Sequence, residues 1–94
     1  GAIYKEAVKY LEAISGLCVR VKAIPDKGQM LRIPLEPPVV MQNQWISGTV
    51  DEIIIIFPEK EKPYLMILDD KARPFFYTFE RDTDKLLKTI WEMK

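Results

Sequence analysis

The stretch "GTVDEIIIIFPEKEKPYLMILDDKAR", residues 48–73, predicts a β-hairpin around which the rest of the chain can be interpreted. Its charged centre "PEKEK", residues 58–62, separates two runs rich in isoleucine, leucine and aromatic residues. Such runs favour strands, and a five-residue connection is within the usual range for hairpins. We therefore expect antiparallel strands over residues 49–57 and 63–72.

The register of this hairpin follows from the turn, because a loop over residues 58–62 sets Ile55 opposite Leu65. Side chains alternate between the two faces of a strand. The same register therefore sets Asp51 opposite Asp69, on the face that carries the apolar side chains. The expected hairpin has an apolar centre and two opposed acids at its open end.

The opposed acids predict a metal site. Directly opposed residues of a sheet lie about 5 Å apart at Cβ, and two carboxylates at that distance repel by roughly 3 kcal/mol when the effective dielectric is near 20. A divalent cation removes this repulsion when both carboxylates become its ligands. The chain has no histidine and one cysteine, so oxygen ligands dominate and favour Mg²⁺ or Mn²⁺. Asp51 and Asp69 are the expected ligands.

Lys71 lies two residues beyond Asp69, about 7 Å along the same face of the expected strand. A cation held there would polarise a phosphate and lower the pKa of a bound water. The lysine would orient or deprotonate that water, or offset charge on the phosphate. These residues predict metal-dependent phosphodiester hydrolysis, whereas the alternative is a strand-end salt bridge between the acids and Lys71.

The flanking segments predict helices at both ends and further strands. Residues 2–15 have helical spacing of apolar side chains and end before Gly16. Residues 17–24 alternate as a strand, and residues 74–79 form a short further strand. A last helix covers residues 84–94, with its apolar side formed by Leu86, Leu87, Ile90 and Trp91, and with Asp82 or Thr83 as its cap.

Prolines restrict the structure that residues 30–41 can adopt. Pro34, Pro37 and Pro38 interrupt residues 30–41, so this segment can be an irregular strand but not a central one. The order of elements predicts an α+β fold in which a mostly antiparallel sheet is flanked by an N-terminal and a C-terminal helix. A chain of 94 residues fits one domain, here residues 1–94.

Composition narrows the class of protein. A single cysteine excludes an internal disulfide and favours a reducing, cytoplasmic setting. No apolar run approaches the ~18 residues that cross a membrane. The formal net charge is zero, whereas domains that bind nucleic acid are usually basic.

The motifs "GTVDEI" (residues 48–53) and "ILDDKAR" (residues 67–73) resemble the signature of the PD-(D/E)XK nuclease superfamily. They are most similar to its RecB-type exonuclease branch, which includes CRISPR-associated and exonuclease V-like enzymes. The resemblance implies a restriction-endonuclease-like core, DNA as substrate, a role in CRISPR or DNA repair, and catalysis by Asp51, Asp69 and Lys71.

The same resemblance implies a third acid and leaves two candidates for it. Glu36 precedes the hairpin, whereas Glu6 lies on the first expected helix, where Holliday-junction resolvases of the superfamily carry a catalytic glutamate. The last helix lacks the Gln and Tyr of the branch's Q-x-x-x-Y pair. We therefore expect a truncated nuclease domain, or one completed by a partner protein or second subunit. The competing expectation is an inactive nuclease fold or a protein-interaction module.

Aromatic residues and one arginine near the hairpin have two interpretations each. Trp45 and the aromatic residues of 74–79 are suited either to stack on unpaired bases or to fill a core, and the second role is more common. Arg73 is suited to contact a phosphate or to lie solvated at the surface.

Overall fold

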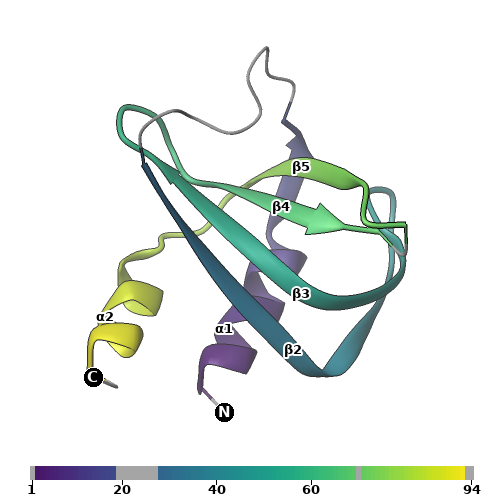
Figure 1. The fold of residues 1–94 in the computed structure, drawn as a ribbon, viewed down its shortest axis with the longest axis horizontal. Coiled ribbons are helices and arrows are strands. Elements are labelled where there is room, and N and C mark those ends of the chain that lie inside the picture. Colours follow the sequence, from purple (N-terminus) through teal and green to yellow (C-terminus); the bar gives the residue numbers. More distant parts are fainter. Residues whose placement is uncertain (1, 19–27, 70, 93–94) are drawn as a thin grey trace.

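A five-stranded antiparallel sheet and two helices make up the computed structural model, which describes residues 2–18, 28–69 and 71–92. The elements are α1 (Ala2–Glu12), β1 (Ile14–Leu17), β2 (Gly28–Gln42), β3 (Ser47–Pro58), β4 (Tyr64–Leu68), β5 (Pro74–Phe79) and α2 (Asp84–Glu92). The strand order is β1-β5-β4-β3-β2, so β2 to β5 form a meander and β1 pairs with its far edge (Figure 1). The predicted α+β class with a mostly antiparallel sheet and terminal helices is confirmed.

The central hairpin of β3 and β4 has the predicted register, with Ile55 paired with Leu65. All four isoleucines of residues 53–56 are buried, as are residues 64–67 of β4. Strands covered on both faces are apolar throughout rather than alternating. The uninterrupted apolar runs of the sequence therefore mark two neighbouring interior strands of the sheet.

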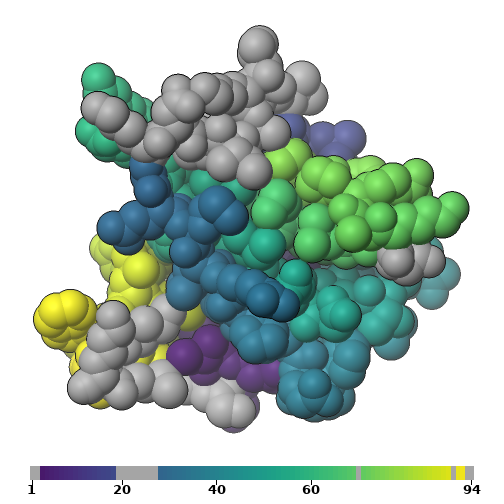
Figure 2. Space-filling model, in the orientation of Figure 1, coloured from purple at the N-terminus to yellow at the C-terminus, as the bar shows by residue number. Residues whose placement is uncertain are grey.

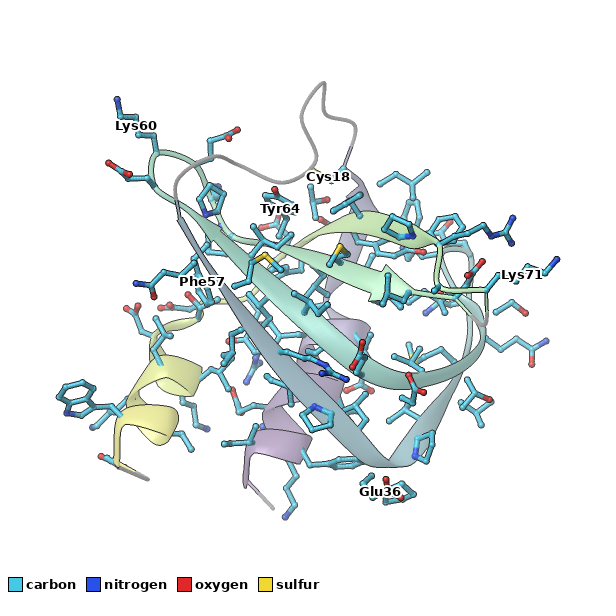
Figure 3. The ribbon with its side chains drawn as sticks, viewed as in Figure 1. Cys18, Glu36, Phe57, Lys60, Tyr64 and Lys71 are labelled. Carbon is cyan, nitrogen blue, oxygen red and sulfur yellow. The ribbon has the colours of Figure 1, made fainter. Side chains whose placement is uncertain are left out.

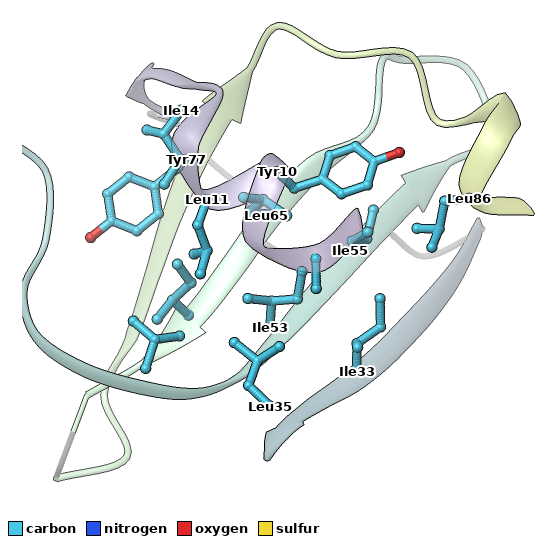
Figure 4. Packing of buried hydrophobic residues seen from close by; sticks show 13 residues of the cluster. Tyr10, Leu11, Ile14, Ile33, Leu35, Ile53, Ile55, Leu65, Tyr77 and Leu86 are labelled. Atoms are coloured by element: carbon cyan, nitrogen blue, oxygen red, sulfur yellow. The ribbon is translucent and has the colours of Figure 1, made fainter. Parts of the chain in front are cut away.

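The main core lies between the sheet and the two helices (Figure 4). Tyr10 and Leu11 of α1 and Leu86 of α2 pack against Ile53 and Ile55 of β3. Complete burial of such an aliphatic side chain contributes about 1.5–3 kcal/mol. The opposite face of the sheet carries a smaller cluster of Ile54, Ile56, Tyr64 and Met66.

β2 is an edge strand, as its prolines predicted, and it runs along the surface of the face shown in Figure 2. Its pairing with β3 shifts register between Pro34 and Val39, where β2 bends sharply (Figure 1). Beyond this shift Val50 is buried in the main core, whereas Asp51 is exposed. Val50 and Ile53 belong to one core cluster although they are three residues apart, so the simple alternation of β3 does not extend past the irregularity.

Two predicted element bounds need correction, and a third predicted element cannot be compared. Helix α1 ends at Glu12 rather than at residue 15, because Ile14 pairs with Phe79 of β5 and joins the core. β4 ends at Leu68 rather than at residue 72, because the chain turns at Asp69. The strand predicted over residues 17–24 lies mostly outside the described residues.

Helix α2 begins where a cap was predicted, since Oδ1 of Asp82 accepts the N–H of Asp84 at 2.8 Å. Its apolar side is only partly covered: Leu86 is buried, whereas Leu87 is 44% and Trp91 76% exposed. The helix lies at the rim of the molecule (Figure 2). Within the described part of the chain, neither helix has the length and apolar character needed to span a membrane.

Candidate functional site

An open pocket of about 650 Å³ lies between the β2–β3 loop and the outer ends of β4 and β5. β3 pairs with β4 only at Ile54, Ile55 and Ile56, so the first half of β3 does not run beside β4. The pocket lies in the space between them. Its volume is within the range usual for small-molecule sites. The lining consists mainly of apolar and aromatic residues: Leu17, Trp45, Ile46, Ser47, Gly48, Thr49, Val50, Ile67, Leu68, Asp69, Arg73, Phe75 and Tyr77.

The loop that forms one wall is fixed by Asn43. Its Oδ1 accepts the backbone N–H of Trp45 at 2.8 Å and that of Ile46 at 2.9 Å. The N–H of Asn43 donates in turn to the carbonyl of Ile46 at 2.9 Å. Asparagine side chains commonly stabilise turns in this way. The wall carrying Trp45 is therefore held by local hydrogen bonds that need no ligand.

Tyr77 joins this wall to the sheet. Its hydroxyl donates to the carbonyl of Trp45 at 3.2 Å, and its ring lies at the end of the main core (Figure 4). Burial raises the pKa of Tyr77 above its ordinary value, so the hydroxyl stays protonated and able to donate at neutral pH. The tyrosine thus holds the two sides of the pocket together from within.

Asp69 and Arg73 form the charged part of the rim. Oδ1 of Asp69 accepts the N–H of Lys71 at 2.9 Å and that of Arg73 at 2.8 Å, while Oδ2 accepts Nε of Arg73 at 2.6 Å. The backbone bond from Arg73 is the main cause that lowers the pKa of Asp69. These bonds close the β4–β5 turn, in which Ala72 has a left-handed φ of 60°. Asp69 is therefore an ionised carboxylate that organises a turn.

The predicted catalytic residues differ in whether they line the pocket. Of these residues, Asp69 lines the pocket, whereas Asp51, Lys71 and Glu36 do not. Asp51 is exposed on β3 opposite the bend of β2, and Lys71 is exposed in the turn that follows β4. Glu36 is exposed at that bend, and Figure 3 shows it at a different edge of the molecule from Lys71. Joint metal binding by Asp51 and Asp69 stays a prediction.

Metal-ligand groups of three or more side chains do not occur among the described residues. Asp70, which the sequence places on the other face of the hairpin, lies outside them. Arg73, which the sequence predicted either to contact a phosphate or to lie solvated, forms an ion pair with Asp69. Lys71 contributes only its backbone N–H to that carboxylate.

Glu6, the alternative third acid, lies in a buried network on the helix side of the molecule. It is 4% exposed, and Nη2 of Arg81 lies 3.2 Å from each of its carboxylate oxygens. Burial alone would raise the pKa of Glu6, but the hydrogen bonds and charge of Arg81, together with the charges of Lys85 and Lys9, outweigh it and lower the pKa. Arg81 also lies 5.6 Å from the ring centroid of Tyr10, whose pKa is raised to about 12, mainly by burial. Glu6 therefore ties α1 to the segment before α2.

The pocket was not found from sequence because its walls come from four separate segments. Local signals for its parts were present: Asn43 precedes Trp45 by two residues, and Asp69 precedes Arg73 by four. Neither spacing shows that these segments meet. Comparison with family models, with curated proteins and with solved structures finds no significant match to this chain.

Proposed function

We propose that this chain is a binding domain whose pocket between the β2–β3 loop and the β4–β5 end takes an apolar or aromatic group. One observation supports it above all: the apolar pocket is held open by hydrogen bonds of Asn43 and Tyr77. A pocket that is formed in advance costs little ordering when a ligand enters. This proposal develops the expectation of a non-enzymatic module.

The charges at the pocket favour binding over catalysis. Asp69 donates no proton at neutral pH, because its pKa is lowered and its two oxygens accept three hydrogen bonds. A general base near neutral pH needs a pKa shifted in the opposite direction. The rim therefore supplies shape and hydrogen bonding rather than a proton-transfer group.

A titration monitored by amide NMR tests the proposal, with the neutral probe 2-naphthylmethanol. We expect saturable shifts at Gly48, Thr49 and Phe75, which line the pocket. Phe75→Ala should weaken binding severalfold, because an aromatic contact contributes about 0.5–1.5 kcal/mol beyond its buried area. Val40→Ala is the matched control, since Val40 is an exposed strand residue outside the pocket lining. Shifts that do not saturate, or that spread evenly over the protein, would contradict a defined site.

A metal-dependent DNA nuclease of PD-(D/E)XK type is the second candidate. Its support is the confirmed pairing of Ile55 with Leu65, which makes neighbours of the strands that lead to Asp51 and Asp69. In this proposal the two acids hold Mg²⁺ or Mn²⁺, Lys71 acts beside the metal, and Glu36 is a third acid. The restriction-endonuclease-like core and a partner that completes the domain belong to the same proposal. Asp69 would have to exchange its bond to Arg73 for the metal.

Thermal unfolding with Mn²⁺ tests this candidate. One site filled at 100 times its dissociation constant stabilises by about 2.7 kcal/mol, which is several degrees for a domain of this size. Asp51→Asn should remove the shift, and Glu59→Gln in the exposed β3–β4 turn should keep it. An equal shift in parent and Asp51→Asn would exclude Asp51 as a ligand. Absence of any shift would remove the metal site altogether.

A further inference from the structure

Arg73 is the one cationic side chain among the described residues that line the pocket. Its hydrogen bond to Asp69 runs through Nε, and no other side-chain bond of Arg73 is formed within the described part of the chain. Its side chain is 64% exposed. The two Nη groups are therefore available at the pocket rim, and the bond through Nε limits how far the guanidinium can turn.

The neighbouring groups at this rim suit an anion. The oxygens of Asp69 are engaged by the turn and by Nε, so they do not compete for the Nη hydrogens. Ser47 and Thr49 add exposed hydroxyl-bearing residues on the opposite wall. Between them, a Cβ at Gly48 would meet no atom within 4 Å, so the backbone there is openly accessible. Guanidinium groups bind carboxylate and phosphate through paired N–H donors.

The rest of the lining suits a flat ring. Trp45, Phe75 and Tyr77 contribute aromatic surface from the loop and from β5, and Ile67 contributes aliphatic surface from β4. Aromatic side chains contact planar ligands by offset or edge-on stacking. The anion-binding Arg73 and the aromatic Phe75 lie in the same pocket, because Phe75 follows Arg73 by two residues.

We infer that the pocket selects ligands in which a planar aromatic ring carries a carboxylate or phosphate, with the Arg73 Nη groups binding the anion. This inference rests on the proposed binding function and specifies its ligand. Asp69 neutralises part of the local charge, so the preference comes mainly from hydrogen-bond geometry at an exposed arginine. We expect a preference of about tenfold for the anionic ligand, in line with one charge-assisted contact.

The test compares probes that differ only in the anionic group. Dissociation constants from amide NMR are measured for 2-naphthoate against 2-naphthylmethanol, and for adenosine 5′-monophosphate against adenosine. We expect the anionic member of at least one pair to bind about tenfold more tightly than the neutral member. Preference within the first pair identifies carboxylate, and preference within the second identifies phosphate. Equal constants within both pairs overturn the inference but leave the binding function intact, whereas no binding of any probe overturns both.

Variants assign the preference to Arg73. Arg73→Gln should abolish it. Arg32→Gln should retain it, since Arg32 also pairs through Nε, with Glu52, is 72% exposed, and lies outside the pocket. If Arg73→Gln disturbs the β4–β5 turn, Arg73→Lys keeps the charge without the fork of donors and should reduce the preference. A full tenfold preference that remains in Arg73→Gln, or that is undiminished in Arg73→Lys, would show that another group binds the anion.

Discussion

Asp69 shows how a single side chain supports two different interpretations of a sequence. On the regular hairpin that the sequence predicts, Asp69 is opposed to another acid and is a predicted metal ligand. In the structure its oxygens accept two backbone N–H groups and the Nε of Arg73. A carboxylate that satisfies these donors stabilises the turn by its charge, rather than destabilising the hairpin by repulsion. The two interpretations predict opposite effects of neutralising it.

Asp69→Asn should lower the midpoint of denaturant unfolding. The amide keeps one acceptor oxygen but loses the negative charge and the second acceptor used by Arg73. Asp51→Asn should leave the midpoint nearly unchanged, because Asp51 is exposed and makes no ion pair among the described residues. A higher midpoint for Asp69→Asn would show that acid repulsion, not turn formation, dominates at this position.

At the scale of elements, the hairpin of β2 and β3 determines where the pocket lies. β2 changes register against β3 between Pro34 and Val39, and beyond that point β3 no longer runs beside β4. The two ends of this hairpin each require an unusual backbone: Gly28 has φ 142° and Gly48 has φ 140°. An added side chain would meet neighbouring atoms at Gly28 but not at Gly48. Comparing substitutions at the two positions therefore distinguishes the cost of backbone strain from the cost of steric overlap.

Gly28→Ala should destabilise the protein more than Gly48→Ala. Both substitutions place a side chain at a backbone conformation that costs about 1–3 kcal/mol for residues other than glycine. At position 28 the new Cβ would also stand 2.4 Å from the carbonyl oxygen of Phe57, whereas at position 48 it meets nothing within 4 Å. Urea unfolding of both variants measures the difference. Equal losses would mean that the β2–β3 pairing at Gly28 can shift to relieve the overlap.

At the scale of the whole molecule, the two terminal segments are joined by charge as well as by apolar packing. Glu6 of α1 and Arg81, which precedes α2, are separated by 75 residues and form a largely buried ion pair. Tyr10 adds a hydroxyl bond to the carbonyl of Asp82 at 2.9 Å. In this network and at Asp69, the folded state favours an ionised carboxylate.

Stability should fall in acid. The pKa values of Glu6 and Asp69 are lowered on folding, so both groups contribute stability above their unfolded values, 4.5 and 3.8. That contribution is lost as the pH falls through these values toward the lower folded pKa values. Denaturant midpoints between pH 7 and pH 2.5 measure it. Glu6→Gln should lower the free energy of unfolding at pH 7 by about 1.5–3 kcal/mol, the contribution of a hydrogen bond to a charged group. It should also make the loss of stability between pH 7 and pH 2.5 smaller than in the parent.

Glu12→Gln serves as the control for this measurement, because Glu12 is an exposed carboxyl on the same helix. It should keep both the stability at pH 7 and the acid dependence of the parent. If Glu6→Gln loses as much stability in acid as the parent does, the pair with Arg81 does not contribute to the pH dependence.

Those parts of the fold that depend on local pattern could be predicted from the sequence. The turn at residues 58–62 specified the pairing of Ile55 with Leu65, and the prolines of residues 30–41 specified an edge strand. Turn length and side-chain alternation act between near neighbours, so they can be read along the chain. The α+β order of elements followed from the same signals.

The pocket, the ion pair of Asp69 and the burial of Glu6 could not be predicted from the sequence and appear only in the folded protein. The register of β2 against β3 shifts between Pro34 and Val39, and the ion pair of Asp69 is with the guanidinium of Arg73. Glu6 and Arg81, or Tyr77 and Trp45, meet only when distant segments pack together. Such contacts depend on the summed packing of the whole chain, since many local arrangements satisfy the same pattern of apolar and polar residues.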